Sequence, residues 1–250
     1  MKTVRIGGHE LKVYDGIEDM PVRRFHRFSK CLMMDAGIGS DLTAVDAHIS
    51  RAAAWFRSGD GEKAAKELEN LRLSVHLVQE GTNLRGMAFA CLVAEVDGHK
   101  TDSLDDGALA DLIDRLPDLT QRELSEIIGE SKKKIDAELR LYFPGEFGDS
   151  SSKEWCELVI RRMQAQMLEM ETGLEGKVEE MDTRMLTFTQ PRSFSGSNGE
   201  EVAFDRKFED MCLLISEELH ADPKAMTVME YYNAYEYLLR RSKEVSAARR

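Results

Sequence analysis

The stretch LRGMAFACLVAEV, residues 84–96, is the most apolar part of the chain, and it decides how the rest can be arranged. Its unbroken apolar run, from Met87 to Ala94, is far shorter than the roughly 20 residues that a membrane-spanning helix needs. A segment of this kind is typical of the centre of a globular core. We therefore expect a short central helix over Leu84–Val96, ended by Asp97–Gly98.

The composition around this centre is that of a helix-rich protein with a core of its own. The chain has 250 residues, of which 42% are hydrophobic and 32% charged, with five prolines and a net charge of −12. Its four cysteines, Cys31, Cys91, Cys156 and Cys212, are widely separated, which argues against a disulfide framework and a zinc motif and favours a reducing compartment. The first residues lead into a strand-like segment, so we expect no secretion signal.

On the N-terminal side of residue 84 the pattern predicts a β-hairpin followed by three helices. In the hairpin, Val4 and Ile6 alternate with polar residues, and the Gly7-Gly8 pair suits a tight turn. Asp41 and Asp60 are typical N-caps of the second and third helices. The residues expected to face inward are Val22, Phe25, Phe28 and Leu32 in the first helix, Leu42, Val45, Ile49 and Phe56 in the second, and Ala64, Leu68, Leu71, Val75 and Val78 in the third.

On the C-terminal side we expect further helices, a linker and a second hairpin. The segment 146–152, rich in Gly and Ser, predicts a linker between an N-terminal helical domain at 1–145 and a C-terminal unit at 153–250. That unit is expected to hold a long helix, a hairpin and two final helices. Alternation in Leu186–Phe188 and Val202–Phe204, with Asn198-Gly199 between them, predicts the hairpin. The expected fold class is mainly α.

The sequence lacks the short motifs of common enzymes. It contains no Gly-x-Gly-x-x-Gly fingerprint, no Walker A loop, no His-Glu-x-x-His and no Gly-x-Ser-x-Gly elbow. The histidines and cysteines are not spaced as two ligands on one helix face, so we expect no metal, no cofactor and no catalytic site. The acidic loop 102–107 is either a capped helix start or a cation loop, although Leu104 occupies a position where a calcium loop needs an oxygen ligand.

A basic patch is expected on the first helix. Arg23, Arg27 and Lys30 share one of its faces. The patch suits either a phosphate or acidic partner surface, or a solvated face that is paired with nearby acids. The acidic balance of the whole chain argues against a nucleic-acid partner.

Two further groups of side chains suggest a protein–protein interface. Met163 and Met167 lie on a predicted helix, where they are either core filler or an adaptable binding surface. The last helix carries Tyr231, Tyr232, Tyr235 and Tyr237. Tyr231 and Tyr235 fit an inward stripe with Val228 and Leu238, so we expect Tyr232 and Tyr237 to point elsewhere, toward a partner.

One segment within residues 205–245 resembles a known family. The stretch Leu219–Pro223, followed by Met226–Tyr232, resembles tail assembly chaperones of tailed bacteriophages, in which a helix and an Asp-Pro turn precede a Met-Thr-x-x-Glu helix start. The resemblance implies a non-enzymatic bacteriophage morphogenesis protein, either such a chaperone or a minor virion component. Its partners would be other phage structural proteins, or a second copy of itself, in the bacterial host cytoplasm or in the virion. The alternatives are a bacterial helical adaptor protein and an enzyme with a dispersed acidic site.

Overall fold

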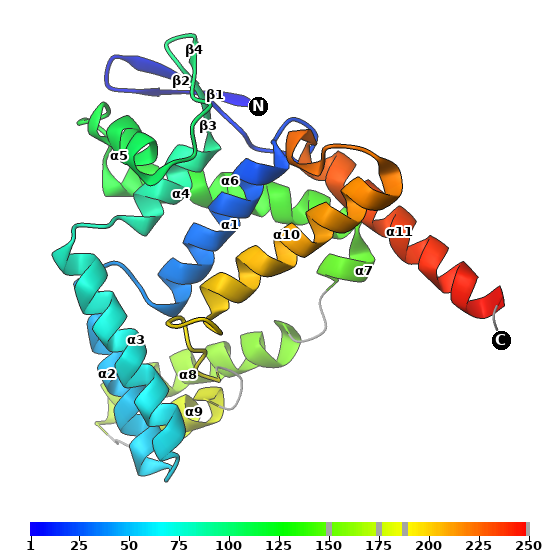
Figure 1. Ribbon diagram of the computed structural model, residues 1–250. Coiled ribbons are helices and arrows are strands. Elements are labelled where there is room, and N and C mark those ends of the chain that lie inside the picture. Colours follow the sequence, from blue (N-terminus) through cyan, green and yellow to red (C-terminus); the bar gives the residue numbers. More distant parts are fainter. Residues whose placement is uncertain (149–151, 174–176, 187–189, 249–250) are drawn as a thin grey trace.

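The protein is mainly helical, as predicted, with one small sheet (Figure 1). The computed structural model describes residues 1–148, 152–173, 177–186 and 190–248. The elements in these residues are β1 (Lys2–Ile6), β2 (His9–Val13), α1 (Val22–Gly37), α2 (Leu42–Arg57), α3 (Gly61–Gln79), α4 (Leu84–Leu92), β3 (Val93–Val96), β4 (His99–Lys100), α5 (Asp106–Asp114), α6 (Gln121–Tyr142), α7 (Pro144–Phe147), α8 (Ser152–Thr172), α9 (Lys177–Leu186), α10 (Glu200–Leu219), the 3-10 turn η1 (Pro223–Ala225) and α11 (Val228–Ala248).

The sheet confirms the N-terminal hairpin and corrects the prediction for the central segment. Its strands are antiparallel in the order β1-β2-β3-β4, and Gly7 takes the positive φ of 57° in the first turn. The predicted helix over Leu84–Val96 is wrong beyond Leu92, because the last four residues form β3 and pair with β2. A two-stranded hairpin is marginal alone, and β3 gives it a third strand. Asp97–Gly98 is therefore the β3–β4 turn and not a helix end.

Helix α4 is the centre of the main core. All eight buried residues among its nine are apolar or glycine, and it packs against α1, α5 and α6. Phe89 and Leu92 are completely buried there, together with Phe28 of α1 and Ile135 of α6. The most apolar stretch of the sequence is thus the element around which the N-terminal part of the chain is assembled.

The predicted second hairpin is wrong where the structure tests it. Val202–Phe204 lies inside helix α10, and Leu186 is the last residue of helix α9; residues 187–189 lie outside the described part of the chain. Gly199 is extended and precedes Glu200 and Glu201, whose carboxylates occupy the first turn of α10. Acidic side chains at that end of a helix are stabilised by the helix dipole, and this favours a helix over a strand.

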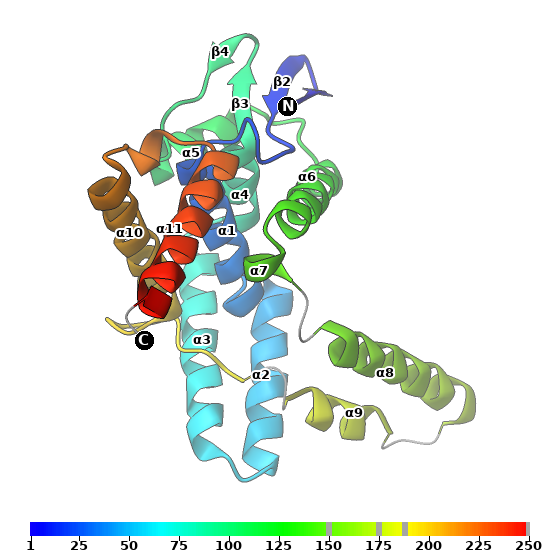
Figure 2. The same cartoon turned by 90° about the vertical axis from the view of Figure 1, so that its right-hand side faces the viewer.

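The last helices pack on the first one, although they are far from it in sequence. The backbone N–H of Val22 donates to the Met226 carbonyl at 2.9 Å, and that of Val228 donates to the Met20 carbonyl at 2.9 Å. Helices α8 and α9 instead pack against each other and form an arm beside α2 (Figure 2). The predicted linker begins in α7, and its residues 149–151 lie outside the described part of the chain. The division at 146–152 stays a prediction.

Candidate functional site

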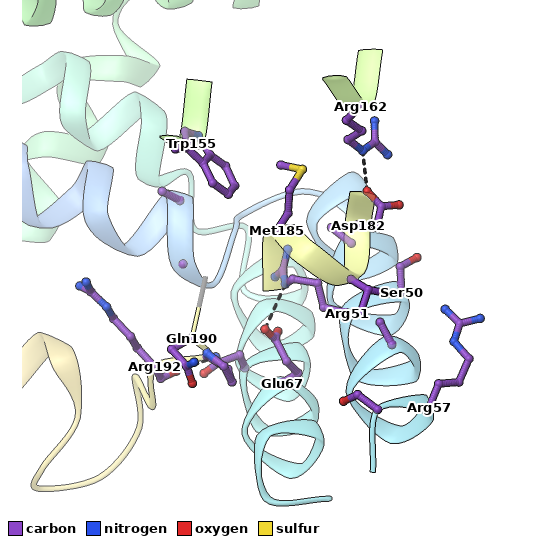
Figure 3. A pocket seen from close by; sticks show the side chains of 18 of the residues that line it. Ser50, Arg51, Arg57, Glu67, Trp155, Arg162, Asp182, Met185, Gln190 and Arg192 are labelled. Atoms are coloured by element: carbon purple, nitrogen blue, oxygen red, sulfur yellow. Dashed lines mark hydrogen bonds and ion pairs between the residues drawn. The ribbon is translucent and has the colours of Figure 1, made fainter. Parts of the chain in front are cut away.

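An open groove of about 1250 Å³ lies between the α2–α3 hairpin, the α8–α9 arm and the segment 190–194. Figure 3 shows side chains from these elements converging on it. The hairpin begins where the sequence predicts, because the Asp41 carboxylate accepts a hydrogen bond from the Ala44 N–H and the Asp60 carboxylate accepts one from the Lys63 N–H. Helix capping by two aspartates thus positions one wall of the groove.

A buried polar network lies where α2 and α3 meet. His48 and Glu67 are 1% and 3% exposed, and Nδ1 of His48 lies 2.8 Å from Oε2 of Glu67. Nε of Arg51 donates to Oε1 of Glu67 at 3.1 Å. Burial raises the pKa of Glu67, but the hydrogen bond from His48 and the charge of Arg51 outweigh burial and hold the pKa below its ordinary value. Glu67 is therefore a buried anion that is neutralised by its neighbours.

The hydrogen bonds of His48 engage both of its ring nitrogens within the protein. Its Nε2 lies 2.6 Å from the Ile38 carbonyl oxygen, which only accepts, so Nε2 carries a proton. Its Nδ1 lies 2.8 Å from both Glu67 and Arg51, an acceptor and a donor, so it has a partner in either protonation state. With both ring nitrogens engaged inside the protein, His48 does not present a general base to the groove.

The segment 190–194 closes one side of the groove. Asn70 of α3 donates its Nδ2 hydrogen to the Arg192 carbonyl at 2.8 Å. The Phe194 ring packs on Gly37 of α1 so closely that a Cβ at residue 37 would lie 1.9 Å from it. The absence of a side chain at Gly37 is what admits the ring, which fixes the segment against α1.

The rim of the groove carries arginine side chains that are paired with carboxylates. Arg57 pairs with Glu179 at 3.2 Å, and Arg162 pairs with Asp182 at 2.6 Å. Both pairs join different helices, and the Arg57 pair ties the arm to the hairpin. Each of these two guanidinium groups faces a carboxylate, which offsets its charge at the rim of the groove. Trp155 and Met185 add apolar area to its lining.

The predicted basic patch is mostly neutralised by the protein itself. Arg23, Arg27 and Lys30 line a smaller cavity of about 340 Å³, together with acidic residues of α10. Arg27 pairs with Asp106, and Lys30 bonds to Asp205 at 2.6 Å. Lys30 is 7% exposed, so its predicted role in a partner interface is wrong. Arg23 is exposed on the same face.

The four tyrosines of α11 are not buried and exposed in the way that the sequence predicts. Tyr231 is buried, and the Tyr232 ring centroid lies 5.5 Å from that of Phe143 and 5.0 Å from that of Phe147. The expectation that Tyr232 points toward a partner is therefore wrong, because α7 and α6 cover it. Tyr235 is half-buried, and Tyr237 is 48% exposed.

The predicted methionines lie on the surface of α8. Met163 and Met167 are 60% and 63% exposed. The sequence reasoning missed the groove and the His48–Glu67–Arg51 network. The one signal for the network was His48 and Arg51, three residues apart on one helix, a spacing that puts two polar side chains on one face.

No metal-binding cluster is present in the described part of the chain. No three His, Cys, Asp or Glu side chains there come together in a way that would hold an ion. In the acidic loop 102–107, Asp105 accepts a hydrogen bond from Ser103, and Asp106 pairs with Arg27. The loop leads into α5, which begins at Asp106.

Comparisons of the chain with protein-family models, with curated proteins and with solved structures find no match. Among the described helices, none combines the length and the apolar character that crossing a membrane requires. The function must therefore be argued from the surfaces and cavities described above.

His26 predicts an acid-sensitive contact between α1 and α10. Its ring is stacked between Phe204 and Phe208, at 4.6 and 4.1 Å between ring centroids, and its Nε2–H donates to Asp205 at 2.9 Å. Burial lowers the pKa of His26 although the Asp205 carboxylate opposes this. The folded state thus binds this proton less readily than the unfolded chain, so the stability is complete above about pH 6.5 and falls as the pH drops toward the lower folded pKa.

We expect the free energy of unfolding to decrease between pH 7.5 and pH 5.0 through this histidine, by at most about 1.4 kcal/mol per pH unit. Urea unfolding at both pH values measures the decrease. A His26→Phe variant keeps a stacked ring without a titrating group and serves as the control. An equal pH dependence in both proteins would contradict the assignment.

Proposed function

We propose that the chain is a non-enzymatic bacteriophage morphogenesis protein, a tail assembly chaperone or a minor tail component, which binds an apolar segment of another phage structural protein on its α8–α9 arm. One observation carries the proposal. The outer side of α8 bears Ile160, Met163, Met167 and Met170, which are 55%, 60%, 63% and 82% exposed.

The spacing of these four residues makes them one continuous surface, which we call the α8 stripe. They follow one another at intervals of three, four and three residues. This repeat keeps side chains on one side of a helix and is the pattern of a helix that packs lengthwise on another segment. Methionine adapts its shape to different apolar partners, so the α8 stripe suits a protein that holds a client during assembly.

Charge and sequence likeness support the same reading. A net charge of −12 keeps a chain with an exposed apolar stripe from aggregating before its partner arrives in the host cytoplasm. The segment that resembles phage tail chaperones forms η1 and the start of α11, where Thr227 and Glu230 bond reciprocally at the helix start. The alternative of an enzyme is disfavoured by the engaged ring nitrogens of His48.

The test is binding to the proteins that are encoded beside this gene, which the proposal expects to include phage tail proteins; each is purified separately. Isothermal titration should detect a stable complex with one of them. The Met163→Glu, Met167→Glu double variant should weaken that complex at least 100-fold, because burying one methionine side chain stabilises by about 1.5–3 kcal/mol. Leu213→Glu changes a leucine of α10 that is 60% exposed and serves as the matched control.

Two results would count against the proposal in different ways. If none of the neighbouring tail proteins binds, the morphogenesis role is wrong. If one binds and both variants bind it like the natural chain, the role stands but the α8 stripe is not the surface.

A further inference from the structure

The solvent side of the α2–α3 hairpin is apolar, because five of the nine residues predicted to face inward in these helices are exposed. Leu42, Ile49 and Phe56 of α2 are 74%, 50% and 58% exposed, and Leu68 and Val75 of α3 are 44% and 37% exposed. The residues buried in their place include His48, Glu67, Asn70 and Ser74. A surface helix ordinarily shows the opposite arrangement, with polar residues outside.

The exposed apolar residues of the two helices lie on one face of the hairpin. Four of the five follow directly after a buried residue: Ile49 follows His48, Phe56 follows Trp55, Leu68 follows Glu67 and Val75 follows Ser74. One residue turns a helix by about 100°. Because the helices are antiparallel, this turn carries the side chains of both to the same side. We call this side the outer hairpin face; it belongs to a hairpin that extends from the body of the molecule (Figure 1).

The outer hairpin face continues along both helices with the spacing of a coiled coil. Its exposed positions are Leu42, Asp46, Ile49, Ala53 and Phe56 in α2, and Ala65, Leu68, Arg72 and Val75 in α3. Within each helix they alternate at intervals of four and three residues, as do the positions by which helices of a bundle interlock. Seven of these nine side chains are apolar, and the small Ala53 and Ala65 allow a second pair of helices to approach closely.

The two charged residues on this face are placed to pair across a two-fold axis. Asp46 lies five residues before Arg51, and Arg72 lies five residues after Glu67, so both lie about 7.5 Å along the hairpin from the Arg51–Glu67 ion pair. Within the described part of the chain, neither Asp46 nor Arg72 has a hydrogen-bond or ion-pair partner. An acidic and a basic side chain therefore lie at the same height along the hairpin axis, one on α2 and one on α3.

We propose that two copies of this chain associate through the outer hairpin face and form a four-helix bundle with its two-fold axis parallel to the helices. In that arrangement α2 of each copy packs on α3 of the other. Asp46 then meets Arg72 of the second copy, twice, and the apolar residues of α2 meet the apolar residues of α3 of the second copy that lie at the same level. The partner is a second copy because the face is complementary to itself in both apolar pattern and charge.

The size of the face predicts the strength of the dimer. Helices of about 16 residues with axes about 10 Å apart bury on the order of 1,000 Å² in total, near the lower limit for specific complexes. The charge of −12 on each copy opposes association at low salt. We therefore expect a reversible dimer in about 0.15 M salt. This inference is independent of the proposed function, because it concerns a different surface from the α8 stripe.

Sedimentation equilibrium of the full chain is the first test. The natural chain should show a concentration-dependent mass that rises from 28.3 kDa toward twice that value. Ile49→Glu and Leu68→Glu should each weaken association at least 100-fold, with melting temperatures close to that of the natural monomer, since both side chains are exposed in one copy. Leu213→Glu should dimerise normally. A natural chain that stays monomeric at 200 µM overturns the proposal.

Charge exchange tests the arrangement. Asp46→Arg alone places two arginines together at each contact, and Arg72→Asp alone places two aspartates together, so each variant should associate at least tenfold more weakly. Mixing the two variants restores both ion pairs in the heterodimer, and association should return. If mixing does not restore it, the parallel two-fold arrangement is wrong, because an effect within one copy cannot be rescued by another.

Discussion

Replacing Tyr232 by alanine is expected to lower the free energy of unfolding by about 3–5 kcal/mol, the range for truncating a large aromatic side chain, because its partly buried ring packs against the core. The ring lies between Phe143 and Phe147 on one side and Tyr231 on the other, with centroid distances of 5.5, 5.0 and 5.3 Å. Burial also raises the pKa of Tyr232 to about 12. Truncating the side chain leaves a cavity where α11, α6 and α7 meet.

The measurement is thermal unfolding of the two single variants Tyr232→Ala and Tyr237→Ala. For a chain of this size the first should melt roughly 6–20 °C below the natural protein. Tyr237 is 48% exposed, so its variant should stay within about 0.5 kcal/mol of the natural protein. Equal, small changes in both variants would mean that Tyr232 is not packed as the structure places it.

The contrast between the two tyrosines shows what helical spacing cannot predict. The spacing correctly assigns Tyr231 to the inward stripe of α11. It assigns Tyr232 to the outside only on the assumption that the helix has one covered side. Residues 143–147 lie against the second side, and nothing in the local pattern around residue 232 reports their position.

Several predictions that rest on local signals are confirmed by the structure. The caps at Asp41 and Asp60, the hairpin turn at Gly7 and the overall helical character are all found in the structure. The sequence predicts a helix at Val93–Val96 where the structure has a strand. A continuous apolar run shows neither the helical nor the strand periodicity of hydrophobic residues, so the two cannot be told apart from it. The strand is decided by pairing with residues 11–13, which lie 80 to 85 positions away.

The faces of α2 and α3 were predicted wrongly for a different reason. Each helix carries two stripes about 100° apart, one apolar and one that mixes alanine with His, Glu, Asn and Ser. The hydrophobic rule selects the apolar stripe as the inner one. The structure buries the mixed stripe, in which His48 bonds to Glu67 and to the Ile38 carbonyl, and the Asn70 amide nitrogen donates to the Arg192 carbonyl. The groove is likewise unpredictable from sequence, because its walls come from segments between residues 33 and 194.

Replacing Glu67 by leucine is the second change for which we expect a large effect, a loss of about 3–5 kcal/mol of stability. The carboxylate is 3% exposed and is the shared acceptor for His48 and Arg51. Without it, Arg51 can turn toward solvent, because its side chain is 34% exposed. His48 is 1% exposed, so it stays buried in the variant, and its Nδ1 loses the Glu67 carboxylate as a hydrogen-bond partner.

A double-mutant cycle with His48→Leu separates the network from simple packing. If the two side chains stabilise the fold through their mutual bond, the double variant should be more stable than the sum of the single losses predicts, by about 1–3 kcal/mol. If the losses of stability in the two single variants add up to the loss in the double variant, each residue acts through its own packing. The bond between the two side chains then contributes no coupling free energy.

The pH dependence of a Glu67→Gln variant gives a second, independent reading of the same network. Because the folded pKa of Glu67 is below its unfolded value of 4.5, its stabilising effect is present above pH 4.5 and is lost as the pH falls through the folded pKa. Glutamine keeps the shape but does not titrate. The variant should therefore be less stable than the natural chain at pH 7, and the difference should shrink below pH 4.5. A difference that stays constant down to pH 3 would contradict a charged Glu67, and the buried pair would then be a neutral hydrogen bond.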